Sequence, residues 1–206
     1  MQIALFTALP PNIQDELQQL AERYGDPLVH TAQLTTGKKF DPLSKKDRYG
    51  EVCMVVRRKN GRLLTMTKTH YPKHAYRLLT GGINHGEGIL DALLRETYEE
   101  TGLEVHVKRF LTAITYTLQQ NPEEPVFYTF AFLLDEVAGT LGAIDPHERV
   151  EDYREIEPAE LLPMAEHLEH LDANFTQELL GHWNEWGKFR AVVHRKVYEA
   201  LQTEKP

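Results

Sequence analysis

Cysteine and long apolar runs are both scarce in this chain of 206 residues. Its single cysteine, Cys53, excludes a disulfide within the chain, and its neighbours Val-Cys-Met-Val-Val predict a buried core thiol. No apolar run approaches the length of a transmembrane helix, so no membrane contact is expected. The apolar start has no basic region before it, which argues against a secretory signal. We therefore expect a cytoplasmic protein.

Positive charge is also in short supply. The chain has 23 Lys and Arg residues against 31 Asp and Glu residues, giving a formal net charge of -8 at pH 7. This balance argues against a large phosphate-binding surface, so nucleic acid is not an expected partner. An acidic protein also repels small anionic ligands unless bound cations reverse the local field.

The acidic residues include a dense group in the segment 81–103, which reads GGINHGEGILDALLRETYEETGL. At 100° per residue, Glu96, Glu99 and Glu100 lie on one face of a predicted helix. Like charges at these spacings destabilise an isolated helix by roughly 0.2–0.5 kcal/mol per pair, which indicates that a cation offsets them. Carboxylate oxygens at this density suit Mg²⁺ or Mn²⁺ better than zinc.

Glycines surround this helix. Gly81, Gly82 and Gly88 flank or lie within the loop before it, and glycine lets a loop backbone approach a ligand closely. Gly102 follows the last acidic residues and fits a left-handed helix end, with Leu103 as its hydrophobic contact. We expect a loop–helix–loop that directs its carboxylates toward one point.

The segment resembles the Nudix box, G-x5-E-x7-R-E-U-x-E-E-x-G-U with U aliphatic, which is the signature of the Nudix hydrolases. The one departure is Thr97, where the family usually has an aliphatic residue. The helix places Thr97 toward the core, where its methyl can pack and its hydroxyl can bond a carbonyl one turn earlier. The matching positions are Gly81, Glu87, Arg95, Glu96, Glu99, Glu100, Gly102 and Leu103.

The resemblance implies a metal-dependent hydrolase that cleaves a diphosphate bond in a nucleoside diphosphate derivative. Mg²⁺ or Mn²⁺ is the implied cofactor, and ADP-ribose or a nucleotide sugar is the default substrate. One alternative is a house-cleaning nucleoside triphosphate pyrophosphohydrolase, and another is a non-catalytic nucleotide-binding regulator. Members of the family are often dimers, so a homodimer is one assembly that the resemblance suggests.

The resemblance also assigns roles to the acidic segment. Glu87, Glu96, Glu99 and Glu100 are the implied metal ligands, and Glu96, Glu99 and Arg95 are the implied catalytic residues of the box. We expect Arg95 to orient the carboxylate of Glu99 or Glu87 by a bidentate contact.

Two regions outside the box are further candidates, although each could also be a plain surface loop. In the family a carboxylate outside the box often binds another metal or serves as general base, which makes Glu148 and Glu151 in the acidic loop 145–152 catalytic candidates. Upstream of the box, Tyr71 or Tyr76 could stack on a base, while Lys73 and Arg77 could reach phosphate. The predicted substrate-binding set is Lys73, Tyr76, Arg77, Gly81 and Gly82.

The fold class predicted by pattern and resemblance is α/β, a Nudix-type α/β/α sandwich with a mixed sheet and helical extensions at both ends. Residues 1–47 are predicted as an N-terminal extension with one helix at 13–24, a short strand at 2–7 and an irregular stretch at 25–49. Residues 48–163 are the predicted Nudix domain, with strands at 51–57, 62–68, 104–118, 125–136 and 153–156. Residues 164–206 are predicted as a C-terminal helical extension packed on the Nudix domain. The helices predicted for this part of the chain are 159–181 and 183–202.

Overall fold

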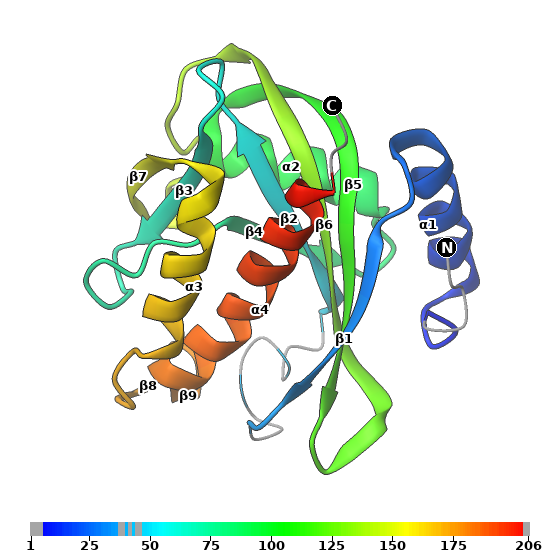
Figure 1. Cartoon of the computed structure of the whole chain (residues 1–206), viewed down its shortest axis with the longest axis vertical. Helices are drawn as coiled ribbons and strands as arrows, with labels where there is room; N and C mark the ends of the chain where they lie inside the picture. Colours follow the sequence, from blue (N-terminus) through cyan, green and yellow to red (C-terminus); the bar gives the residue numbers. More distant parts are fainter. Residues whose placement is uncertain (1–5, 37–39, 41–42, 44–46, 204–206) are drawn as a thin grey trace.

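The chain folds into strands and helices in a computed structural model that describes residues 6–36, 40, 43 and 47–203 (Figure 1). The predicted strand at 2–7 lies almost wholly outside the described residues. The elements are α1 (Pro11–Tyr24), β1 (Leu28–Leu34), β2 (Arg48–Arg57), β3 (Leu63–Lys68), β4 (Leu79–Asn84), α2 (Ile89–Thr101), β5 (Leu103–Leu118), β6 (Asn121–Gly139), η2 (Pro146–Glu148), β7 (Val150–Ile156), η3 (Pro158–Glu160), α3 (Leu161–Glu169), β8 (Phe175–Thr176), β9 (Gly181–His182) and α4 (Trp183–Gln202).

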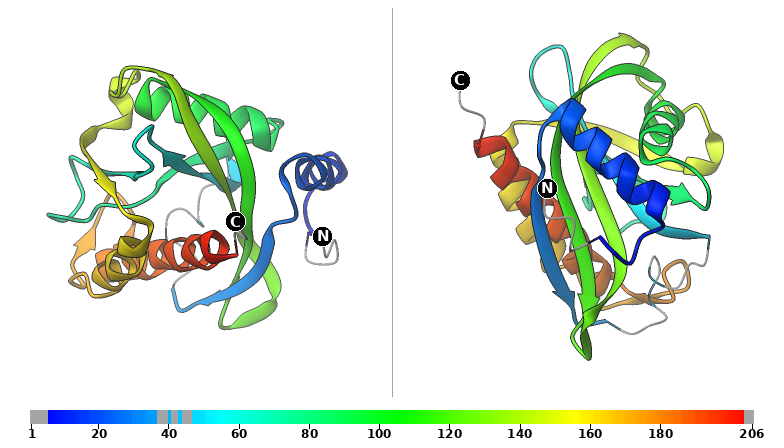
Figure 2. Two further views of the ribbon diagram at one scale, coloured as in Figure 1. Left: turned by 45° about the horizontal axis from the view of Figure 1, so that its top comes forward. Right: turned by 90° about the vertical axis from the view of Figure 1, so that its right-hand side faces the viewer.

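The main sheet has seven strands of mixed direction. Its order is β1-β5-β6-β2-β3-β7, and β4 pairs with β2 beside that path. The pairs β1–β5 and β2–β6 are parallel, whereas the β5–β6, β2–β4 and β3–β7 pairs are antiparallel. Helices α1 and α2 cover one face and helices α3 and α4 the other (Figure 2). The predicted α/β/α sandwich with a mixed sheet is confirmed.

Strand β2 shows why both faces are covered. Successive side chains of a strand point to opposite faces, and here both sets are apolar. Val52, Met54 and Val56 join the buried cluster under α1 and α2, whereas Cys53 and Val55 join the cluster under α3 and α4. All five are fully buried, so the prediction of a buried core thiol at Cys53 is confirmed.

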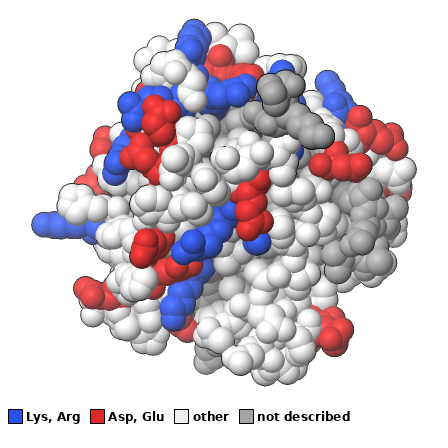
Figure 3. Space-filling model, viewed as in Figure 1, with Lys and Arg blue, Asp and Glu red and all other residues white. Residues whose placement is uncertain are grey.

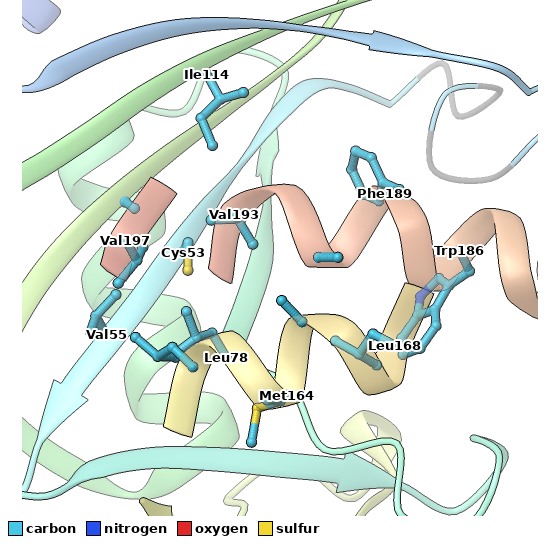
Figure 4. Close-up of a cluster of buried hydrophobic side chains, with 14 of the residues drawn as sticks. Cys53, Val55, Leu78, Ile114, Met164, Leu168, Trp186, Phe189, Val193 and Val197 are labelled. Atoms are coloured by element: carbon cyan, nitrogen blue, oxygen red, sulfur yellow. The ribbon is translucent and has the colours of Figure 1, made fainter. Parts of the chain in front are cut away.

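The C-terminal helix α4 is a core element. Phe189, Val193 and Val197 face the sheet, where Cys53 and Val55 lie opposite them (Figure 4). On the outer surface of this layer, positive and negative side chains lie next to one another (Figure 3), as in the pairs formed by Arg195 with Glu169 and by Lys196 with Glu199. Helix α4 therefore packs against the sheet through its apolar side.

Two predicted stretches differ from the structure. The helix predicted at 159–181 ends at Glu169, and Phe175–His182 contains the short hairpin β8–β9, because Asp172 and Asn174 interrupt the helical pattern with side chains that favour turns. The stretch predicted as irregular at 25–49 contains β1, which pairs with β5 over seven residues. An edge strand that pairs with a distant partner has no local signal beyond its own few residues.

Within the described residues, no helix combines the length and apolarity needed to span a membrane.

Candidate active site

The acidic segment forms helix α2, and the N-terminal extension caps it. Gly88 precedes the helix, and the carboxylate of Glu16 on α1 accepts hydrogen bonds from the amides of Ile89 and Leu90 at 2.9 and 3.0 Å. These amides have no partner within the helix, so an acidic cap satisfies them and also complements the helix dipole. The cap comes from more than 70 residues away, which no local pattern could indicate.

The far end of α2 and the burial of Thr97 follow the sequence predictions, whereas Leu94 on the predicted apolar side is 41% exposed. Gly102 ends the helix in the left-handed conformation at φ 65°, and Leu103 is buried beside it. Thr97 is fully buried, and its hydroxyl donates to the carbonyl of Leu93 at 2.6 Å. The departure from the aliphatic residue of the box is therefore accommodated without an unpaired polar group.

Arg95 holds the acidic residues together. Its Nε and Nη2 donate to the two carboxylate oxygens of Glu87 at 2.7 and 2.8 Å, and its Nη1 lies 2.8 Å from Glu96 Oε1 and 3.0 Å from Glu99 Oε2. Nη2 also donates to the carbonyl of Gly82 at 3.0 Å. The hydrogen bond with Arg95 is the main reason that the pKa of Glu87 lies below its ordinary value. Arg95 thus contacts both carboxylates that the sequence offered as alternatives, Glu87 through two nitrogens and Glu99 through one.

Gly81 leaves the space that Glu96 occupies. A Cβ added at Gly81 would lie 2.1 Å from both Cγ and Cδ of Glu96 and 2.4 Å from Oε2. Glu96 is 8% exposed, and burial raises the pKa of its carboxyl although Arg95 opposes the shift. The first glycine of the segment is therefore needed for the packing of a predicted ligand.

Glu100 is the most buried carboxylate of the helix. It has no exposed surface, and neither of its oxygens has a hydrogen-bond donor in bonding geometry. Its nearest cation is Lys68 Nζ, which lies 3.0 Å from Oε1 and donates to Glu148 Oε2 at 2.6 Å. Burial raises the pKa of Glu100 to about 7, even though Lys68 opposes the shift. Burial also disfavours the charged form of Glu148, but Lys68 outweighs it and holds that pKa below the ordinary value.

A cavity of about 260 Å³, here called the inner cavity, opens beside these carboxylates. Five Lys or Arg residues and three Glu residues line it, so its charge balance is opposite in sign to the chain's formal net charge of -8. Such a lining attracts anions. The cations are Arg48, Lys68, Arg77, Arg149 and Arg190, and the glutamates are Glu51, Glu148 and Glu178.

Some predicted site residues line this cavity and others do not. Arg77, Gly81, Gly82 and Glu148 line it beside α2. Glu151 is exposed on β7 outside the cavity, so of the two loop carboxylates only Glu148 reaches it. Two other predicted substrate-binding residues line separate cavities: Lys73 lies in a larger one, and Tyr76 in a third, where its hydroxyl donates to Asp152. Arg95 and the predicted metal ligands of the acidic segment are not among the residues that line the inner cavity.

Sequence reasoning missed the contribution of α4 to the inner cavity. Arg190 Nη1 donates to both carboxylate oxygens of Glu51 on β2 at 2.7 and 2.8 Å, and both side chains are more than nine-tenths buried. His194, one turn later, accepts from the amide of Leu78 at Nε2 (3.0 Å), and its Nδ1 lies 2.7 Å from the carbonyl of Arg190. Because a carbonyl accepts and an amide donates, His194 is neutral with its proton on Nδ1. Burial lowers its pKa to about 4.

The residues present fit a hard divalent cation. The side chains on this face of α2 offer carboxylate oxygens, which Mg²⁺ and Mn²⁺ prefer, and the buried oxygens of Glu100 have unused acceptor capacity. In the described part of the chain, no three His, Cys, Asp or Glu side chains are already gathered into a metal-holding group. The carboxylates instead form ion pairs with two cations. Arg95 contacts three of them, and Lys68 contacts Glu100 and Glu148.

A comparison with known protein families identifies the family of this chain. A NUDIX domain model matches residues 48–179, which is more than half of the chain. The chain belongs to the Nudix hydrolase family. No curated protein matches the sequence.

Solved structures share the fold of this Nudix hydrolase at low sequence identity. A UDP-X diphosphatase is similar over 80% of this chain and 68% of its own, with 14% identity and a TM-score of 0.50. An ADP-ribose pyrophosphatase from Streptococcus suis has 14% identity and a TM-score of 0.45 over 76% of this chain and 93% of its own. A MutT protein from Methanosarcina mazei Go1 has 14% identity and a TM-score of 0.45 over 78% and 99% of the two chains. At these identities the likeness concerns the fold alone.

Proposed function

We propose that this Nudix hydrolase uses Mg²⁺ or Mn²⁺ to cleave the diphosphate bond of a nucleoside diphosphate derivative, with ADP-ribose or a nucleotide sugar as the substrate class. The observation that carries the proposal is the Glu100 carboxylate, which is fully buried and has no hydrogen-bond donor in bonding geometry. A buried carboxylate is costly unless cations or donors compensate it. Lys68 supplies one positive charge to the two carboxylates of Glu100 and Glu148. When both are ionised, one negative charge remains for a divalent cation to compensate.

In this proposal Glu96, Glu99 and Glu100 would hold the ion, and Glu87 would support them from the loop. Arg95 fixes the first two carboxylates and Glu87 through one guanidinium, so the ligand set is oriented before a cation arrives. The bound ion would neutralise diphosphate charge and lower the pKa of the attacking water.

Arg77 is the proposed phosphate-binding residue of the inner cavity. Its Nε and Nη1 donate to neutral oxygens, namely the hydroxyls of Tyr71 and Thr80 and the carbonyl of Leu78. Arg77 is 2% exposed and lines the cavity, so its positive charge would be available to a bound anion without being cancelled by a hydrogen-bonded carboxylate.

The test is product release from a panel of nucleotide sugars, dinucleotides, coenzyme A and nucleoside triphosphates with Mg²⁺ or Mn²⁺, with and without chelator. We expect metal-dependent cleavage of nucleoside diphosphate derivatives that Glu100→Gln abolishes and the exposed-residue control Glu104→Gln retains. Release of pyrophosphate from triphosphates alone would identify the house-cleaning alternative. Tight nucleotide binding without turnover of any compound would identify a regulator.

Glu148 is the proposed general base, because it lines the inner cavity and Lys68 keeps it ionised. Loss of a general base typically costs 10²- to 10⁴-fold in rate. We therefore expect Glu148→Gln to lower kcat by about 10²- to 10⁴-fold, and Glu151→Gln, in the same loop but outside the cavity, to lower it by less than about twofold. The reverse order would assign the base to Glu151, and no loss in either variant would place it on α2.

A further inference from the structure

A second cavity, here called the outer cavity, adjoins the inner one. Its volume is about 500 Å³, and it lies between the loop after β3 and the segment from the end of α3 to the start of α4. The two cavities share His70 and Tyr71 in their linings. The predicted residue Lys73 belongs to the outer cavity.

The two cavities lie on either side of one cluster of rings. Tyr71 contacts Trp186 at a centroid distance of 4.7 Å and Trp183 at 5.8 Å, and the two tryptophans meet edge to face at 5.4 Å. His70 contacts Tyr71 at 4.8 Å. Trp186 lines the inner cavity and Trp183 the outer one, so the ring cluster contributes to both linings.

The inner cavity is smaller than the sites that enclose a whole drug-sized ligand. Sites that enclose drug-sized ligands measure about 300–1,000 Å³. At about 260 Å³, and with a strongly ionic lining, the inner cavity suits the diphosphate and an adjoining polar group. The rest of such a substrate must extend beyond it, and the outer cavity is the adjoining space.

The lining of the outer cavity has a different chemistry. It has one Lys, Lys73, and one Asp, Asp172, so it lacks the excess of Lys and Arg over acidic residues that the inner cavity has. Trp183 is half-buried and lines the cavity, and Asn174 is an exposed residue whose side-chain amide can donate and accept hydrogen bonds. Accessible rings beside neutral hydrogen-bonding groups are the combination that binds a planar heterocycle.

We propose that the outer cavity is the nucleobase subsite of this enzyme. The inference rests on the proposed function, because it assumes a nucleotide whose diphosphate lies in the inner cavity. The base stacks on the ring cluster at Trp183 and Tyr71, and Asn174 bonds its edge. The C-terminal segment beyond residue 163 therefore contributes to substrate choice.

Binding without turnover tests this proposal, so that its outcome does not depend on hydrolysis. The ligands are the four common nucleoside 5′-monophosphates and ribose 5-phosphate, measured by calorimetry. Base–aromatic stacking is typically worth a loss of about 5- to 150-fold when the ring is removed. We expect Trp183→Leu to weaken the preferred monophosphate by about this factor and to change ribose 5-phosphate binding by less than about twofold.

Two further variants keep the test independent of folding. Asn174→Ala changes only an exposed side chain and should weaken the preferred base selectively. Phe175→Ala removes an exposed ring outside both cavities and should change neither ligand. Equal loss of both ligands in Trp183→Leu, or wild-type protein that binds the monophosphates no tighter than ribose 5-phosphate, would overturn the proposal. Absence of hydrolysis with selective monophosphate binding would instead refute the proposed function and leave the subsite standing.

Discussion

Replacing Gly81 by alanine should disable the acidic site through one contact. The added Cβ would lie 2.1 Å from Cγ and Cδ of Glu96, whereas ordinary contacts begin at 3.4 Å, so one of the two groups must move by about 1 Å. Gly81 does not have a positive φ, so alanine adds no backbone strain there. The effect is therefore a steric conflict with a predicted metal ligand.

Its magnitude follows from the neighbours of Glu96. Overpacking a buried site typically costs about 1–3 kcal/mol, and a displaced Glu96 also loses its contact with Arg95 Nη1 at 2.8 Å. Because Arg95 is 30% exposed, solvent weakens that ion pair, and we expect a total loss of about 1–3 kcal/mol. A misplacement of about 1 Å can cost about 100-fold in rate, which is the expected fall in kcat.

The matched control is Gly82→Ala on the same strand. A Cβ at Gly82 would meet the terminal guanidinium of Arg48, a long side chain that can rotate away, so this variant should lose much less stability. Urea unfolding and steady-state kinetics give the two readouts. In the Glu96→Ala background the Gly81→Ala change should become nearly neutral for stability. Equal losses of stability at both glycines, or no relief in that background, would refute the steric account.

Three further predictions concern groups outside the cavity. Glu16→Ala removes the cap from α2 and should cost about 0.5–2 kcal/mol in urea unfolding, against almost nothing for the exposed control Glu22→Ala. His194 has a pKa of about 4 in the folded protein and 6.5 when unfolded, so the unfolded state binds the extra proton between these values and stability falls as the pH drops from 6.5 to 4. That loss is up to about 1.4 kcal/mol per pH unit, and His194→Gln should remove it from the measured pH dependence; an unchanged slope would contradict a neutral buried imidazole. Burial raises the pKa of Cys53, so a thiol reagent should label the protein only after unfolding, and rapid labelling of native protein would contradict its burial.

The acidic helix could be predicted from the sequence because its determinants are local. Glu96, Glu99 and Glu100 share a face through the helical period alone, and Gly102 marks the helix end by its own conformational freedom. The contact of Arg95 with Glu99 is likewise one helical turn long. Each of these relations lies within a few residues, where the backbone geometry is already determined by the helix.

The rest of the candidate site could not be predicted in this way because its contacts are long-range. Arg190 and Glu51 are 139 residues apart, and Leu78 and His194 are 116 apart. Lys68 ends a strand whose pattern gives no sign that it will lie between Glu100 and Glu148. Sequence periodicity reports which face a residue occupies, but not which distant element packs against that face.

The predicted division at residues 47 and 163 follows the extent of the family resemblance, and contacts in the structure cross both limits. Before the first limit, Glu16 caps the helix that carries the proposed metal ligands, and β1 completes one edge of the sheet. Beyond the second, α4 contributes fully or nearly fully buried side chains to the core, and Arg190 to the inner cavity. The residues between the two limits would therefore expose one apolar face of the sheet and leave Glu51 without its cation, a combination that favours an unstable fragment. The local motif supplies the carboxylates, and the two ends of the chain supply much of the packing that holds them in place.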